Sequence, residues 1–81
     1  MNHKIYFNTQ TMTRFNRRLH TTGGLMQDAE IALMKADKSQ QPLEHINHEK
    51  NAVKSLEEAK AELLAIVADI ETALEKANEG F

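Results

Sequence analysis

The stretch PLEHINHEKNAVKSLEEAKAELLAIVADIETALEKANEG, residues 42–80, decides the fold, because it contains neither glycine nor proline between its two end residues. Pro42 suits the first position of a helix, where its missing N–H is not needed. Glu44 lies in the first turn, where the helix dipole favours a negative charge, and Gly80 stands where a C-terminal cap is expected. The stretch therefore predicts one long helix over residues 42–79.

Apolar residues recur along this helix at heptad spacing in two rows. One row holds Ile46, Val53, Val67 and Leu74, and the other holds Leu56, Leu63, Ile70 and Ala77. A charged residue interrupts each row, Lys60 in the first and Glu49 in the second. A third row beside them holds Ala52, Ala59, Ile66 and Ala73, which widens the apolar stripe and lets another backbone come close. This is the face of a helix in a bundle.

The first half of the chain predicts a second helix, over residues 11–36. Apolar side chains keep a three-and-four spacing there, at Met12, Phe15, Leu19, Met26, Ala29, Leu33 and Ala36. Gly23 and Gly24 fall on the outer side of this pattern, and two interior glycines cost only about 2 kcal/mol together. We expect one continuous helix, and a break at the glycine pair, giving three helices in all, is the alternative.

The polar connector DKSQQ, residues 37–41, has the usual length of a loop between antiparallel helices. The chain is thus predicted to be all-α, an antiparallel helical hairpin with a long C-terminal helix. Folding back about the loop brings Leu33 near Ile46 and Met26 near Val53. The same register sets Met12 near Val67.

The first ten residues differ in character from the hairpin domain, residues 11–81. Ile5, Tyr6 and Phe7 form a short apolar run that is followed by Asn8 and Thr9. Such a composition favours an extended segment or a turn over a helix. We expect residues 1–10 to form a short extended arm. Either this arm is a strand that needs a second copy to pair with, or it is a tail whose aromatic side chains fold onto the end of the bundle or bind a partner.

Self-association is expected because an 81-residue chain builds only a marginal core by itself. The segment 25–36 is apolar nearly all round, and one short hairpin arm does not cover the stripe of a helix of 38 residues, about 57 Å long. We expect the chain to form a homodimer or a higher homo-oligomer, and the predicted architecture is a dimeric helical bundle. The sequence does not identify any other protein partner. The candidate interaction residues are Leu25, Met26, Ile31, Leu33, Met34, Val53, Leu56, Leu63, Val67 and Ile70.

The charge is unevenly distributed along the chain. Residues 1–22 hold four basic residues and no acid, whereas residues 23–81 hold six lysines and twelve acids. The basic cluster of Arg14, Arg17 and Arg18 has two interpretations. In the antiparallel register it lies alongside the acids Glu57, Glu58 and Glu62 and neutralises them. Alternatively it is an anion-binding arm of a small nucleic-acid-binding regulator, since arginines supply phosphate affinity without sequence specificity.

Other function classes have little support in the sequence. His45 and His48 stand about one turn apart, but a metal site needs a third or fourth ligand and none is near, so we expect no metal and no cofactor. There is no cysteine nucleophile, no serine in a nucleophile elbow and no glycine-rich phosphate-binding loop, so we expect the chain to have no enzymatic activity.

No apolar run approaches the 20 or so residues of a membrane span, and no apolar stretch of a signal peptide is present. With no cysteine to form disulfides, the chain fits a cytoplasmic location. The expectation is a small helical protein–protein interaction or assembly module, with the nucleic-acid-binding regulator as the alternative.

Overall fold

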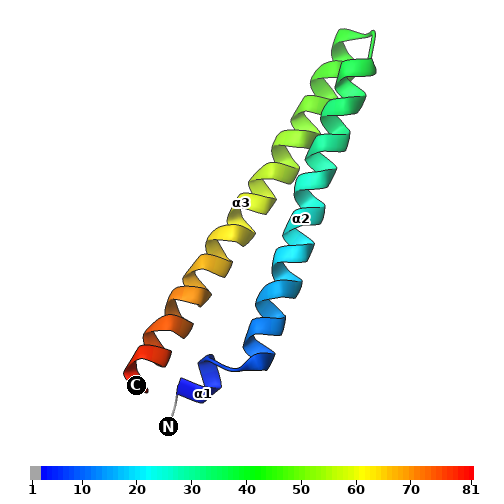
Figure 1. The fold of residues 1–81 in the computed structure, drawn as a ribbon. Coiled ribbons are helices and arrows are strands. Elements are labelled where there is room, and N and C mark those ends of the chain that lie inside the picture. The colour runs from blue at the N-terminus through cyan, green and yellow to red at the C-terminus, as the bar shows by residue number, and fades with distance from the viewer. Residues whose placement is uncertain (1–2) are drawn as a thin grey trace.

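The computed structural model describes residues 3–81, with side chains from Ile5 onward, and this part of the chain is helical with short connections. The elements are α1 (His3–Tyr6), α2 (Thr9–Lys38) and α3 (Pro42–Glu79). α2 and α3 run antiparallel along their whole length, joined by a tight loop at residues 39–41, and α1 lies at the open end beside the end of α3 (Figure 1). The predicted helical hairpin is confirmed.

The bounds of α3 are those predicted, and their causes are local. Gln41 is extended at the N-cap and its carbonyl accepts the first helical hydrogen bond, from the amide of His45 at 3.0 Å. Pro42 follows at the first helical position. At the other end the amide of Gly80 bonds to the carbonyl of Ala77 at 3.0 Å, which satisfies one of the free carbonyls of the last turn.

The expected extended arm at residues 1–10 is wrong for the described residues. His3–Tyr6 forms a turn of helix, and α2 begins at Thr9 because Asn8 caps it. The Asn8 side-chain oxygen accepts hydrogen bonds from the amide of Thr11 at 2.9 Å and from the Thr11 hydroxyl at 3.1 Å. A capping asparagine of this kind starts a helix, so α2 begins at Thr9, before the predicted start at residue 11. Residues 1 and 2 lie outside the described residues.

α2 continues unbroken through the glycine pair, as expected. Neither Gly23 nor Gly24 has a positive φ, and a Cβ built on either one would meet nothing within 4 Å. The glycines therefore serve no turn and no close approach. The glycines remain helical because the segments of α2 before and after the pair both pack against α3.

Small side chains form the core between α2 and α3. The buried residues of the described part are Thr11, Thr22, Ala29, Ala36, Ala52, Ala59, Ile66, Ala73 and Ala77. Ile66 is the single large apolar side chain among them. Thr22 is only 1% exposed, and its hydroxyl donates to the carbonyl of Arg18 at 2.8 Å, which satisfies the buried polar group within its own helix.

The row of α3 that packs against α2 is the row that was expected to let another backbone come close. The alanine row, with Ala52 and Ala59, faces α2, whereas Val53 and Leu56 are more than half exposed beside it. Two long helices gain dispersion contacts along their whole length when the backbones approach closely, and only small side chains allow that approach. The larger residues are therefore left on the flank.

The resulting molecule is a thin rod. Its principal extents are 60 × 16 × 12 Å and its radius of gyration is 18.1 Å, against about 12 Å for a compact chain of this length. Its accessible surface of 6414 Å² exceeds by roughly 1,500 Å² the area that a globular monomer of this mass exposes. None of the described helices combines the length and the hydropathy that crossing a membrane requires.

Candidate interaction surface

An open apolar groove runs along one flank of the hairpin. It has a volume of about 470 Å³ and lies where α2 and α3 meet, because Met26 of α2 lines it together with side chains of α3. The α3 residues that line it are Val53, Leu56, Glu57, Ala59, Lys60, Leu63, Leu64 and Val67. Met26 is 49% exposed and Leu64 60%, so side chains that elsewhere form protein cores lie open to solvent here.

A second groove of about 320 Å³ continues this flank toward the open end of the hairpin. Phe7, Met12 and Phe15 line it from the N-terminal side, with Ile70 and Leu74 from α3. Ile70 follows Leu56 and Leu63 in the same heptad row, so the two grooves share one side of α3.

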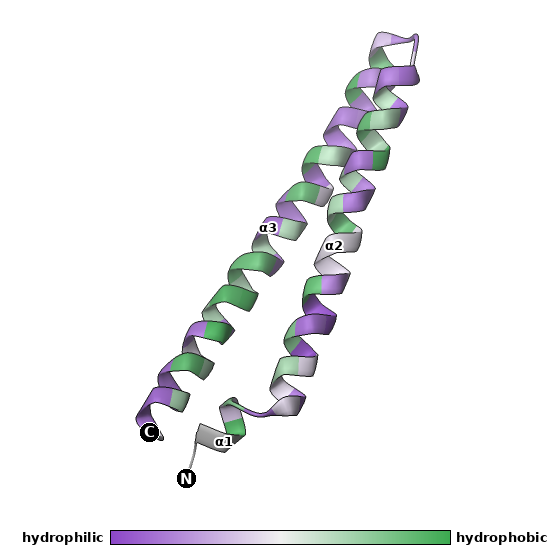
Figure 2. Ribbon diagram, viewed as in Figure 1, coloured by the Kyte–Doolittle hydropathy of each residue, from purple (hydrophilic) through white to green (hydrophobic). Residues whose placement is uncertain are grey.

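We call this surface the apolar face and define it by Met12, Met26, Val53, Leu56, Leu63, Leu64, Val67, Ile70 and Leu74. Hydrophobic segments recur along α3 in Figure 2, from the middle of the helix toward its C-terminal end. An exposed apolar surface of this length on a small protein is typical of an interaction site.

Six of the ten predicted interaction residues line these grooves: Met26, Val53, Leu56, Leu63, Val67 and Ile70. Leu33 is exposed and belongs to the heptad row of Met26. Leu25 is partly buried and belongs to the row of Arg18 and Ala32, which faces α3. Ile31 and Met34 are exposed but occupy other rows of α2, and the structure does not bring them to the grooves.

The apolar face also contains residues that the interaction prediction did not include. Met12 and Leu74 belong to the same heptad rows as Met26 and Val67, so extending the rows to the helix ends would have found them. Met12 shares its groove with Ile70 and Leu74, and not with Val67, the neighbour predicted by the folded-back register. Phe7, which lines the second groove beside this face, reaches it because the chain changes direction at Asn8, the N-cap of α2, and no periodicity indicates this.

The two charged interruptions of the apolar rows stay on this flank. Lys60 lines the larger groove among valine and leucine side chains. Glu49 lies one heptad before Leu56, and its Oε1 is 3.2 Å from Nε2 of His45. Each is thus a charged group at the edge of an apolar surface.

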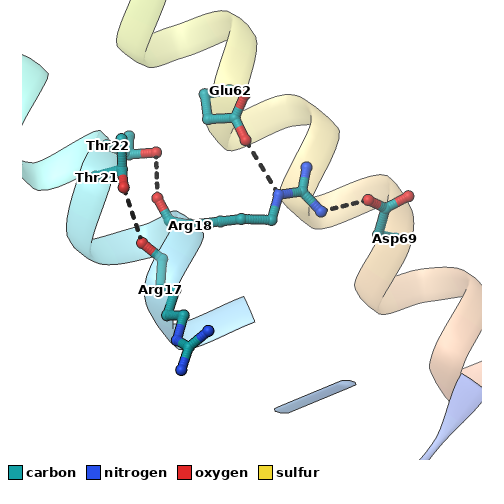
Figure 3. Close-up of polar contacts among 6 residues, drawn as sticks. All are labelled: Arg17, Arg18, Thr21, Thr22, Glu62 and Asp69. Carbon is teal, nitrogen blue, oxygen red and sulfur yellow. Dashed lines mark hydrogen bonds and ion pairs between the residues drawn. The ribbon is translucent and has the colours of Figure 1, made fainter. Parts of the chain in front are cut away.

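Arg18 connects the two long helices through two acids of α3. Its Nε donates to Oε1 of Glu62 at 3.1 Å, and its Nη1 donates to Oδ2 of Asp69, two turns further along (Figure 3). The hydrogen bonds to Asp69 and then to Glu62 raise the pKa of Arg18 above its ordinary value. The predicted pairing with Glu62 is confirmed, whereas the contact with Asp69 was not expected.

The other two arginines of the basic cluster make no ion pair with any residue that the structure describes, so the predicted neutralisation of Glu57 and Glu58 by the cluster is wrong for these residues. In Figure 3 the side chain of Arg17 points away from both acids of α3, and its carbonyl accepts a hydrogen bond from the Thr21 hydroxyl at 3.1 Å. Arg14 and Arg17 together line a shallow groove near the start of α2, with Thr9, Gln10 and Thr13.

His45 ties the beginning of α3 to the end of α2. Its Nδ1 lies 2.8 Å from the carbonyl of Ala36, and because a carbonyl only accepts, Nδ1 carries the proton. Its Nε2 faces Glu49. Within residues 3–81 no group of three or more histidine, cysteine, aspartate or glutamate side chains is placed to hold a metal ion.

Comparison with known proteins gives no relative from which a function could be carried over. No protein-family model matches this chain, and neither a curated protein nor a solved structure is significantly similar to it.

Proposed function

We propose that this chain is a helical protein–protein interaction or assembly module without a catalytic role, which associates through its apolar face, in the first place with copies of itself. One observation carries the proposal. The hairpin builds its own core mostly from alanine and threonine, with Ile66 as the one larger apolar side chain, and leaves most of the larger aliphatic side chains of α3, such as Val53 and Leu56, exposed on one flank.

The energetics support association. Burying a leucine or valine side chain contributes about 1.5–3 kcal/mol, and an alanine contributes much less, so the largest apolar gain available to the chain is still unused in the isolated hairpin. A standard protein interface buries about 800 Å² on each partner. The roughly 1,500 Å² by which this rod exceeds a globular monomer is enough for such an interface.

Sedimentation equilibrium of the purified chain between about 5 and 200 µM tests the proposal. We expect a mass at least twice the 9.2 kDa of one chain. Leu56→Glu and Leu63→Glu place a charge on the apolar face and should return the protein to the monomer while circular dichroism still shows helix.

Met34→Glu is the matched control, because Met34 is 50% exposed but lies in another row of α2. It should leave the association unchanged. A single 9.2 kDa species over the whole concentration range would contradict the proposal, and so would a dimer that Leu56→Glu does not weaken.

One observation favours a second candidate function, the small nucleic-acid-binding regulator. Arg14 and Arg17 are exposed, lie one turn apart and have no acidic partner among the described residues. Two such arginines can contact backbone phosphates, and such contacts do not depend on the nucleic-acid sequence. The net charge of −2 opposes this binding, and the interaction module is therefore the function that we favour.

A further inference from the structure

The two charged interruptions of the apolar rows are opposite in sign and lie on one flank of one helix. Glu49 and Lys60 are eleven residues apart, which is about 16 Å along α3. This separation is too large for an ion pair within the chain. Both residues nevertheless stand where the heptad rows put apolar side chains, Glu49 in the row of Leu56 and Lys60 in the row of Val53.

Pairing of α3 with a second copy of itself gives these charges different neighbours in the two possible orientations. In a parallel pair each residue meets its own equivalent, so Lys60 faces a second lysine and Glu49 a second glutamate. Like charges in an interface cost free energy. In an antiparallel pair the two rows face each other, and a lysine in one row meets a residue of the other row.

We propose that the two apolar rows of α3 between Ile46 and Leu63 bind the same rows of a second copy with the two α3 helices antiparallel, so that Glu49 lies opposite the partner's Lys60, and Lys60 opposite the partner's Glu49. This inference rests on the proposed function. The two-fold axis then crosses α3 between Lys54 and Ser55. Val53 lies opposite the partner's Leu56, and Ile46 lies opposite the partner's Leu63.

The register follows from the same two residues. A shift of one heptad in one direction sets Lys60 opposite the partner's Leu56, and a shift in the other direction sets it opposite the partner's Pro42. Both shifts leave two lysines and two glutamates without partners in the interface, and unpaired charges there are costly. A polar pair inside an apolar seam commonly fixes register in this way.

The neighbours of Glu49 are compatible with this pair. Nε2 of His45 lies 3.2 Å from Oε1 of Glu49, and the second carboxylate oxygen of Glu49 is available to a lysine. The Glu49 side chain is 51% exposed, so it reaches a partner without a change in the hairpin. Lys60 already lines the apolar groove, where a partner helix would lie.

Charge reversal at the two positions tests the arrangement. Glu49→Lys alone and Lys60→Glu alone should each raise the dimer dissociation constant about tenfold or more in sedimentation equilibrium at low salt, because two like-charge contacts replace two ion pairs. The double variant Glu49→Lys/Lys60→Glu restores both pairs and should return the constant to within about threefold of the original. An equimolar mixture of the two single variants should associate as well as the unchanged chain.

Lys54→Glu is the matched control, since it reverses a charge of α3 that the apolar rows do not contain, and it should change the constant less than threefold. Circular dichroism checks that every variant keeps its helix content. A mixture that associates more tightly than the unchanged chain, with single variants no weaker than it, would establish the parallel orientation and overturn the inference.

A dimer that responds to Leu56→Glu but to none of the charge reversals also overturns the inference and leaves the proposed function standing. A chain that is monomeric throughout contradicts the proposed function itself. The two failures are therefore distinguishable.

Discussion

Arg18 of α2 donates its Nε hydrogen to Glu62 of α3 over 3.1 Å, and the same guanidinium reaches Asp69. This contact joins the two long helices between their midpoint and their open end, on either side of the buried Ile66. It fixes how far one helix is displaced along the other, because the two acids stand two turns apart on α3.

Replacing Arg18 with glutamine should lower the melting temperature by a few degrees at most, since partly exposed ion pairs stabilise weakly. The difference between the variant and the unchanged chain should shrink in 1 M salt, where charges are screened beyond about 3 Å. Thermal melts followed by circular dichroism measure both effects. Arg17→Gln is the control and should melt unchanged, because Arg17 has no ion pair among the described residues.

Ala52→Leu should destabilise the protein by about 1–3 kcal/mol, because Ala52 is buried against α2 and a larger side chain forces the helices apart. Ala61→Leu makes the same change at an exposed position of the same helix and should shift stability by less than about 0.5 kcal/mol. Urea unfolding at one protein concentration measures both. Equal effects of the two substitutions would mean that the alanine row does not form the close contact between the helices.

Gly23→Ala and Gly24→Ala should each stabilise the protein by about 0.5–1 kcal/mol. Both positions are helical without a positive φ, and a methyl group at either meets nothing within 4 Å. The gain arises because alanine loses less backbone entropy than glycine on forming a helix. Gly80→Ala, at the end of α3, is the comparison and should change stability little. Loss of stability in the glycine variants would show that the pair serves a partner or a bend.

Binding to duplex DNA should be undetectable at physiological salt if the chain is an interaction module, because its net charge of −2 repels a polyanion. Fluorescence anisotropy at several salt concentrations tests this. If Arg14 and Arg17 instead contact phosphates, binding should weaken with a log–log slope near −2, about 0.9 for each contact.

In that case the variant Arg14→Gln/Arg17→Gln should lose binding and keep its melting temperature. Arg18→Gln is then the internal control, since Arg18 is already held by Glu62 and Asp69. Salt-dependent binding with this mutational pattern would favour the regulator over the assembly module.

The sequence by itself determined the elements of this protein. Pro42 and Gly80 set the bounds of α3, the polar loop set the antiparallel direction, and the unbroken spacing through Gly23 and Gly24 kept α2 whole. These features depend on the conformational preferences of single residues and on local capping. Local chemistry also starts α2 through the cap of Asn8, although the composition of the first ten residues predicts an extended arm.

Only the tertiary structure decided which row of α3 faces α2. Periodicity shows that Ala52, Val53 and Leu56 share one broad stripe, but it does not say which of them lies at its centre. That choice depends on how closely two backbones approach, which is a property of both helices together. Close approach favoured the alanines, and the valines and leucines were left on the open flank.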